Sequence, residues 1–466
     1  MRKFLILFLL GLQVTAQEYS VKKGMVVDSL KVSDSLSQTY ALYLPTTFSN
    51  TKKWPVLFVF DPEGRGKAAA QLFKTVAEEQ GYLVVSSNDI NSENELVKNV
   101  EIAAKLMSNV SRVLPADFQQ VATAGAMDGA KVATSMPLMF SNILGVVAAG
   151  NQYMNMDLLD RKNDFAFIGI VGDEQFTVTG MNLTAAALDD KKHLTAVYTY
   201  TGSKDWPTPD IVSSAVGSLS LKAMKDGLRP KDLQLVNSLY QNDIGRVNKM
   251  MSNGDMLQAW HLLELMSDKY EDLRDPAEIE QKQSQLRRSR SFLEQRREEA
   301  EVMATEDRLK NDFLYYFQED VETANFENLG WWNFQKKKLD SLAQKQGAEA
   351  KMARRVNGFV KEMAETTREE FLRKNPDLEN ELLANMILTI FDPNNYKAYK
   401  RIVTLSAQDN DFGTALFYFE EMLKNGYRNK EGVYNIEGTL ALKMTPDFNW
   451  LVKKYIGEPK YYDREN

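Results

Sequence analysis

One stretch of the chain has the residue types and spacing of a catalytic turn. A short apolar run ends in Gly125-Ala126-Met127-Asp128-Gly129, and an alanine-rich helical pattern follows. Glycines four residues apart between a strand and a helix are typical of a nucleophile elbow, a sharp turn that lifts its central side chain above a sheet. The centre is Met127, whose thioether cannot be deprotonated to attack an acyl group. The sequence therefore predicts an elbow that keeps its shape and lacks its nucleophile.

General bases are scarce, because the chain holds only two histidines, His193 and His261. Acyl transfer needs a nucleophile, a base within hydrogen-bond reach and an acid that orients the base. His261 lies beside Trp260 in a helical pattern, where we expect it to pack. His193 precedes the last predicted strand. The sequence therefore offers no evident histidine for the elbow.

The loop after the last predicted strand ends in Lys204-Asp205-Trp206-Pro207. Together with the elbow, this loop resembles the α/β-hydrolases of the esterase and polyhydroxybutyrate-depolymerase-like type, over roughly residues 40–221. In that family the loop usually reads Gly-Gly-His-x-Trp-Pro, and the elbow reads Gly-Phe-Ser-Gly-Gly-Ala-Arg. The resemblance implies an α/β-hydrolase-like domain in which the serine and the histidine are replaced.

Carried over position by position, the resemblance places the nucleophile on Met127, the base on Lys204 and the acid on Gln175. A lysine is protonated at neutral pH unless it is desolvated, and a glutamine cannot stabilise an imidazolium ion. Under a shifted register Asp173 or Glu174 supplies the acid. Asp128 is an alternative carboxylate nucleophile, which would still need a histidine base. We therefore expect a degenerate triad and no catalytic residue.

A glycine-rich connection, residues 61–66, stands where such hydrolases place their oxyanion loop. We expect this loop to keep the shape of a binding pocket without the reaction. The residues expected at that pocket are Asp61, Pro62, Gly64, Ala126, Asp128 and Trp206. No spacing of histidines or acids resembles a metal-ligand set, so we expect neither a metal nor another cofactor.

The first 16 residues have the composition of a secretory signal peptide. A positive pair at residues 2 and 3 precedes a short apolar run, and small residues before Gln17 suit a cleavage site. The chain contains no cysteine, so an exported form has neither disulfides nor a lipid-modified cysteine. No later run approaches the ~20 apolar residues of a membrane helix. We expect export to a bacterial periplasm as a protein that is not a lipoprotein, with secretion as the alternative.

The chain has 466 residues, which is more than one hydrophobic core usually holds. Two structural classes follow one another along it. A hairpin pattern and then alternating strands and helices predict an α/β domain with a mostly parallel sheet over residues 17–227. Helical periodicity over residues 228–466 predicts an all-α array of helical hairpins, with a long, charged helical stretch from about 275 to about 323. The expected strands are 25–32, 38–44, 56–60, 82–85, 120–123, 143–149, 165–171 and 196–200.

The helical half resembles a degenerate tetratricopeptide array at its last helix pair. Two helices carry the bulky residues Tyr399 and Phe419 and the small residue Ala415. A small residue at such a position lets the two helices approach closely. Trp331 and Trp332 interrupt a polar stretch, and we expect them to lock adjacent helices. The alternative is that these tryptophans and Tyr399 bind a partner, with the tryptophan pair forming a platform for a sugar or a peptide.

Charge excludes one class of partner. The net charge is −7, and no long basic stripe offers a surface to nucleic acid. We expect an exported bacterial pseudo-hydrolase that serves as a protein-binding scaffold in the cell envelope. Its expected partners are other envelope proteins, and association with a membrane complex is one option. The alternative function is an active esterase or other hydrolase, serine-type or non-standard, that acts on exported ester substrates.

Overall fold

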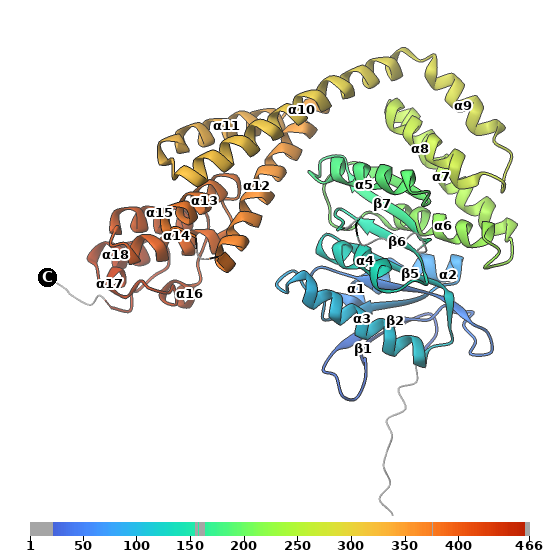
Figure 1. Ribbon diagram of the computed structural model, residues 1–466, viewed down its shortest axis with the longest axis horizontal. Helices are drawn as coiled ribbons and strands as arrows, with labels where there is room; N and C mark the ends of the chain where they lie inside the picture. The colour runs from blue at the N-terminus through green and yellow to red at the C-terminus, as the bar shows by residue number, and fades with distance from the viewer. Residues whose placement is uncertain (1–21, 154–156, 158–163, 375, 462–466) are drawn as a thin grey trace, which may run out of the picture. The chain divides into compact units, whose positions relative to one another are not determined.

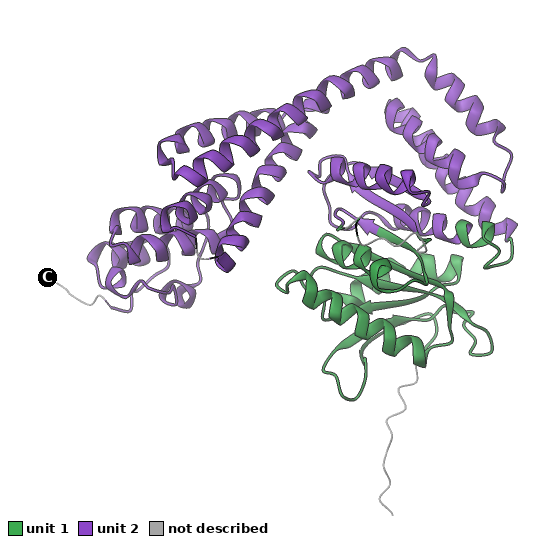
Figure 2. Cartoon of the chain, in the orientation of Figure 1, with its two compact units in different colours: residues 1–147, 153–165, 222–231 green, residues 148–152, 166–221, 232–466 purple. Residues whose placement is uncertain are grey.

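The computed structural model describes residues 22–153, 157, 164–374 and 376–461 of the chain (Figure 1). The predicted signal peptide lies outside these residues. The chain divides into two compact units, which Figure 2 colours separately. Unit 1 comprises residues 1–147, 153–165 and 222–231, and unit 2 comprises residues 148–152, 166–221 and 232–466. The predicted domain boundary after residue 227 stays a prediction.

Eight strands form one sheet in the order β1-β2-β4-β3-β5-β6-β7-β8. β1 pairs antiparallel with β2, and β2 with β4, whereas β4, β3 and β5 are parallel neighbours, as are β7 and β8. The predicted α/β class with a mostly parallel sheet is therefore confirmed. The strands are β1 (Val26–Lys31), β2 (Thr39–Tyr43), β3 (Trp54–Phe60), β4 (Leu83–Ser87), β5 (Ala116–Ala126), β6 (Ile143–Ala149), β7 (Ala166–Gly172) and β8 (Thr195–Tyr200).

Three inner strands, β3, β6 and β7, are continuous apolar runs, as expected of strands covered on both faces. Every residue of β4, β6 and β7 is buried. The accompanying helices place apolar residues on one side: Ile102, Leu106 and Val110 recur every fourth residue and are buried. These helices are α1 (Gly66–Leu72), α2 (Lys74–Gln80), α3 (Leu96–Val113), α4 (Asp128–Met139), α5 (Val178–Asp190) and α6 (Pro209–Lys225).

The chain after α6 is helical, as predicted, and its tetratricopeptide-like arrangement stays a prediction. The predicted charged helical stretch over residues 275–323 is present, and it is divided into two helices. Helix α9 (Ala277–Arg287) ends before α10 (Arg290–Thr323), because the Ser289 side chain accepts the N–H of Phe292 and caps a new helix. No described helix is long and apolar enough to cross a membrane.

The remaining elements of this region are short connections and paired helices. They are α7 (Leu233–Asn253), α8 (Met256–Tyr270), η2 (Phe326–Asn328), α11 (Leu329–Ala343), α12 (Ala348–Lys374), α13 (Leu378–Phe391), α14 (Tyr396–Gln408), α15 (Phe412–Lys424), α16 (Lys430–Tyr434), α17 (Leu440–Lys443) and α18 (Pro446–Tyr455). Antiparallel neighbours such as α14 and α15 bury Tyr399, Ala415 and Phe419 in one apolar cluster. The close packing predicted for this pair is therefore present.

A buried ion pair anchors the hairpin α7–α8 to strand β8 and helix α6. The Lys269 ammonium lies 2.7 Å from Asp243 Oδ2. It also donates to the Tyr198 hydroxyl at 3.0 Å and to the Ser214 carbonyl oxygen at 2.9 Å. Asp243 accepts further hydrogen bonds from the hydroxyls of Ser214 (2.7 Å) and Tyr270 (2.8 Å). All three ammonium donors and both carboxylate oxygens are bonded, which a buried pair requires.

The two charges of this pair shift each other's protonation. Burial alone would raise the pKa of the Asp243 carboxyl, but the charge of Lys269 and the hydrogen bonds outweigh burial and hold this pKa below its ordinary value. Burial alone would lower the pKa of the Lys269 ammonium, and the charge of Asp243 outweighs it, so this pKa is raised. Both groups are therefore charged at neutral pH.

Lys269→Met leaves Asp243 buried without its cation, so the free energy of unfolding at pH 7 should fall by about 3–5 kcal/mol. Burial then raises the folded-state pKa of Asp243 above its unfolded value of about 3.9. The loss of unfolding free energy is therefore small below about pH 3.9 and grows as the pH rises through the folded-state pKa of Asp243. The loss should be smaller at pH 5 than at pH 7.

Urea unfolding at both pH values measures this effect. Arg290→Ala is the control, because it breaks an exposed ion pair with Glu294 at 2.7 Å and should cost less than about 1 kcal/mol. Equal losses for the two variants would show that the buried pair does not anchor α8.

Candidate functional site

Met127 occupies the sharp turn that the sequence predicts. β5 ends at Ala126, α4 begins at Asp128, and Met127 between them has φ 47° and ψ −117°. A positive φ costs a non-glycine residue on the order of 1–3 kcal/mol and persists only where the surroundings hold it. The chain thus has the strained backbone of an elbow at a methionine, whose side chain is partly buried.

Two glycines make this turn possible, because they let backbone segments approach closely. A Cβ atom on Gly125 would clash with the carbonyl oxygen of Gly129, and a Cβ atom on Gly129 would clash with that of Phe60. Phe60 is the last residue of β3 and pairs in register with Gly125 on β5. The elbow therefore lies directly against the end of β3, where the expected oxyanion loop begins.

The loop after β3 uses its backbone donors internally. The buried Asp61 carboxylate accepts the N–H groups of Glu63 (3.0 Å) and Arg65 (3.3 Å). The backbone carbonyl oxygen of Asp61 accepts the N–H of Gly64 at 3.2 Å, and Pro62 has no N–H to donate. The Arg65 guanidinium binds the same carboxylate at 2.9 and 3.1 Å. Residues 62–65 therefore leave no unused amide for a developing oxyanion.

Asp128, the alternative nucleophile, is an ion-pair partner at the start of α4. Its carboxylate lies 2.9 Å from Lys131 Nζ, and 39% of its side chain is exposed. Neither histidine lies on the loop after β8: His193 stands in the turn before that strand, and His261 is exposed on α8. The structure therefore brings no imidazole to the position that the resemblance gives to the base.

Gln175, the position that the resemblance gives to the acid, braces two loops of unit 2. Its side-chain oxygen accepts the N–H of Gly172 at 2.8 Å, and its amide donates to the Lys204 carbonyl oxygen at 3.3 Å. The neighbouring Asp173 carboxylate accepts the N–H of Gly202 at 3.0 Å. A Cβ atom on Gly172 would clash with the Gly202 carbonyl oxygen, so glycine is required where the loops meet. Gln175 therefore has a structural role.

Lys204, the position that the resemblance gives to the base, takes part in these loop contacts through its backbone. Its carbonyl oxygen accepts hydrogen bonds from the Gln175 amide and from the Tyr200 hydroxyl. Burial, followed by the charges of Asp205 and Asp173, raises the pKa of Tyr200 to about 12, which keeps this hydroxyl a donor. The Lys204 side chain is exposed, whereas a lysine acts as a base only when it is desolvated.

Three cations of α12 bind the loop after β7, two of them through the carboxylates of its acids. Lys351 Nζ lies 2.7 Å from Asp173 Oδ2, and Arg354 Nη1 lies 2.6 Å from Glu174 Oε1. Arg355 donates to the Asp173 carbonyl oxygen at 2.7 Å. Each acid that could orient a base is thereby paired with a cation. The sequence signal is the spacing of these cations, because residues three and four apart share one helix face.

Two of the three residues predicted as possible partner contacts are buried. Trp332 has no exposed surface, and its indole N–H donates to Asp320 at 2.8 Å. Tyr399 is 4% exposed. Trp331 is partly buried, with its ring centroid 4.8 Å from that of Tyr316. The tryptophans thus pack between helices, and the structure gives no support to a partner role for Trp332 or Tyr399.

The other residues expected at the pocket differ in their exposure. Pro62 and Ala126 are buried with Asp61, and Gly64, Asp128 and Trp206 are partly buried. Ala126 closes β5, and Trp206 lies on the loop after β8. In the parts of the chain that the structure describes, no group of three His, Cys, Asp or Glu side chains could hold a metal.

A polar pocket of about 680 Å³ in unit 1 is lined by Gly64, and none of the other residues that the sequence predicts at a pocket lines it. The Asn88 amide donates to Asp28 at 3.0 Å and to Thr39 at 3.1 Å, and these three residues form one wall. Arg65 and Lys67 also line the pocket. Its residues come from β1, β2, helix α1 and the loops after β3 and β4, so no local pattern could reveal the whole pocket.

Comparison with known proteins gives partial likeness only. No family model and no curated protein matches the chain. A solved hyperthermophilic esterase of the archaeon Pyrobaculum calidifontis aligns at 13% identity over 47% of this chain and 86% of that chain, with a TM-score of 0.33. A solved arylesterase aligns at 11% identity over 45% and 86% of the two chains, with a TM-score of 0.34.

A third solved structure, assigned as a dipeptidyl aminopeptidase IV of Bacteroides ovatus, aligns at 15% identity over 42% of this chain, with a TM-score of 0.34. This chain spans 35% of the length of that protein. Likeness at these identities and TM-scores carries no information about activity.

Gly129→Ala should destabilise the protein, because the added methyl group meets the Phe60 carbonyl oxygen. We expect the free energy of unfolding to fall by about 1–3 kcal/mol or more. Gly180→Ala is the matched control near the start of α5, where an added Cβ would meet nothing within 4 Å. This variant should gain about 0.5–1 kcal/mol, because alanine is the better helix residue. Urea unfolding measures both, and a harmless Gly129→Ala would contradict the tight elbow.

Proposed function

We propose that this protein is an exported, catalytically inactive α/β-hydrolase-like protein of the bacterial cell envelope, which works by binding other proteins. The observation that carries the proposal is Met127 at the strained position of the elbow, with φ 47°. In an active hydrolase of this kind the nucleophile occupies that position. A thioether has no proton to lose and cannot form an acyl intermediate.

The surroundings support inactivity in each unit taken separately. In unit 1 the amides of residues 63–65 are bound within their own loop. In unit 2 the acids Asp173 and Glu174 are paired with cations of α12. Acyl transfer needs donors and acids that are free to meet developing charge. These polar groups stabilise loops instead.

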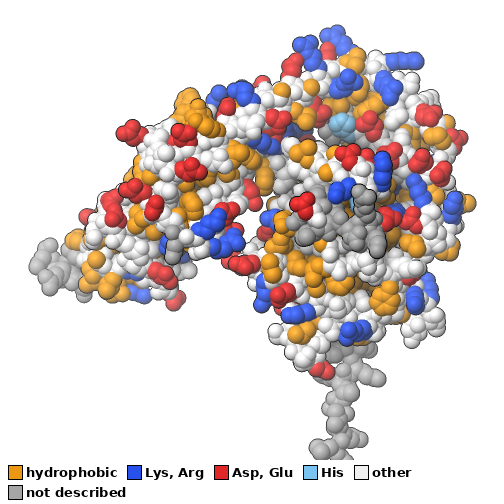
Figure 3. Space-filling view, viewed as in Figure 1, with side chains coloured by type: hydrophobic (Ala, Val, Ile, Leu, Met, Phe, Trp, Pro, Cys, Tyr) orange, Lys and Arg blue, Asp and Glu red, His pale blue; other side chains and the backbone are white. Residues whose placement is uncertain are grey.

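Exposed aromatic side chains in the helical region support a binding role. Tyr315 and Phe334 expose 59% and 62% of their surface, and Phe417 and Trp450 expose 58% and 57%. Aromatic residues are enriched in protein interfaces relative to the rest of the surface. On the face drawn in Figure 3 acidic and basic side chains are interspersed, which favours protein partners over nucleic acid. We propose other envelope proteins as these partners.

A fluorophosphonate probe tests the inactive assignment, because it modifies the activated serine of a serine hydrolase. We expect no labelled serine in the purified protein under conditions that label an active esterase completely. Met127→Ser is the informative variant: it restores a hydroxyl at the elbow, yet no imidazole stands on the loop after β8 to activate it. Peptide mapping by mass spectrometry should therefore find little label on this serine.

A labelled serine in the unchanged protein would overturn the proposal. It would favour the competing function, an active esterase that acts on exported ester substrates. Rapid labelling of the Met127→Ser variant would likewise contradict the proposal, because it would reveal a working base.

A further inference from the structure

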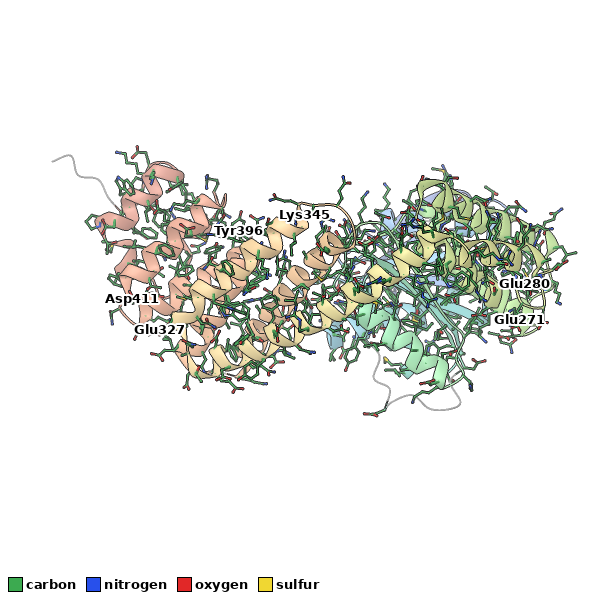
Figure 4. All side chains as sticks on the ribbon, turned by 90° about the horizontal axis from the view of Figure 1, so that it is seen from above. Glu271, Glu280, Glu327, Lys345, Tyr396 and Asp411 are labelled. Carbon is green, nitrogen blue, oxygen red and sulfur yellow. The ribbon has the colours of Figure 1, made fainter. Side chains whose placement is uncertain are left out.

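A second pocket, of about 510 Å³, lies where α8 meets the junction of α9 and α10. Leu257, Trp260 and Phe292 supply apolar lining, and Arg287, Arg296 and Glu264 supply charge. The volume falls in the range of small-molecule sites, roughly 300–1,000 Å³. In Figure 4 the label of Glu271 marks the end of α8 that lies away from Leu257, and the label of Glu280 marks the first turn of α9.

The helix junction that forms this pocket is fixed by Gln295. Asp255 stands at the N-cap of α8 but makes no capping hydrogen bond with its side chain. The Gln295 side chain takes over this role: its oxygen accepts the N–H of Leu257 at 3.0 Å, and its amide donates to the Gly254 carbonyl oxygen at 2.7 Å. The first turns of α10 are thereby tied to the first turn of α8.

The aromatic side of the pocket already holds a guanidinium. The Trp260 and Phe292 ring centroids are 5.2 Å apart, and Phe292 is 2% exposed. The Arg287 guanidinium carbon lies 4.9 Å from the Trp260 ring centroid. A guanidinium that stacks on an aromatic ring keeps the N–H donors at its edge available for a planar anion.

Two arginines of the pocket lack the partners that their neighbours have. Arg290 and Arg297 pair with Glu294 and Glu301, at 2.7 and 2.8 Å. Within the described residues, Arg287 and Arg296 have no carboxylate within 4.0 Å. With Glu264, the fixed charges at the pocket sum to one positive charge, and His261 also lines it. This balance suits a ligand with a single negative charge.

We propose that this pocket binds a carboxylate that is joined to an apolar or aromatic group. The two guanidiniums would bind the carboxylate, and the wall of Leu257, Trp260 and Phe292 would bury the apolar group. Such a ligand is either the carboxyl-terminal residue of a peptide or a free organic acid. The proposal goes beyond the proposed function and does not depend on the absence of catalysis.

Titration calorimetry with matched probes tests the proposal. The probes are a tetrapeptide that ends in phenylalanine with a free carboxylate, the same peptide as its amide, 3-phenylpropionate and 3-phenylpropionamide. Each acid that binds should bind at least roughly tenfold more tightly than its amide. Binding of the peptide acid alone identifies a peptide terminus as the ligand, and binding of 3-phenylpropionate identifies a free acid.

Two double variants of equal charge change make the test specific. Arg287→Gln with Arg296→Gln should weaken binding of the acid roughly tenfold or more, whereas Arg290→Gln with Arg297→Gln should change it less than about twofold. Trp260→Phe should remove the change in tryptophan fluorescence that accompanies binding.

Circular dichroism and thermal unfolding establish that all variants are folded. Three results would overturn the proposal: an amide that binds as tightly as its acid, equal weakening by the two double variants, or no binding of either acid at about 10 mM.

Discussion

The close approach of backbone segments at the elbow is the constraint on which the proposed site depends. Gly125 and Gly129 leave no room for a Cβ atom, because it would meet the carbonyl oxygens of Gly129 and of Phe60 at the end of β3. Met127 between them has a positive φ, which these close contacts hold in place. Since the glycines and the strands set this geometry, the elbow can persist without a nucleophile.

The polar groups around the expected site follow the rule that a buried acceptor must find donors. Asp61 organises the loop after β3, Gln175 joins the loops after β7 and β8, and Asp173 binds α12. Moving any of them into a reacting geometry would break these hydrogen bonds. The same contacts therefore fix the positions of these polar groups within their loops. The buried pair of Lys269 and Asp243 obeys the same rule.

Local sequence patterns predict much of this fold. The remaining features depend on contacts between distant residues, which local patterns do not show. Apolar runs identify the strands, and glycine spacing identifies the turn at Met127, because both signals are local. The break at Ser289 escapes prediction because helical periodicity continues on both sides of it. The contact of Arg355 with Asp173 joins residues 182 apart, so only the folded chain reveals it. The pocket that contains Trp260 is likewise lined by residues of three helices, α8, α9 and α10.

The rate of hydrolysis of short-chain aryl esters tests the central claim most directly. The purified protein should give no turnover above buffer, and Asp128→Asn and Lys204→Ala should leave that result unchanged. Turnover by the unchanged protein that either substitution abolishes would contradict the account, because it would place a working nucleophile or base at a position where the structure provides none.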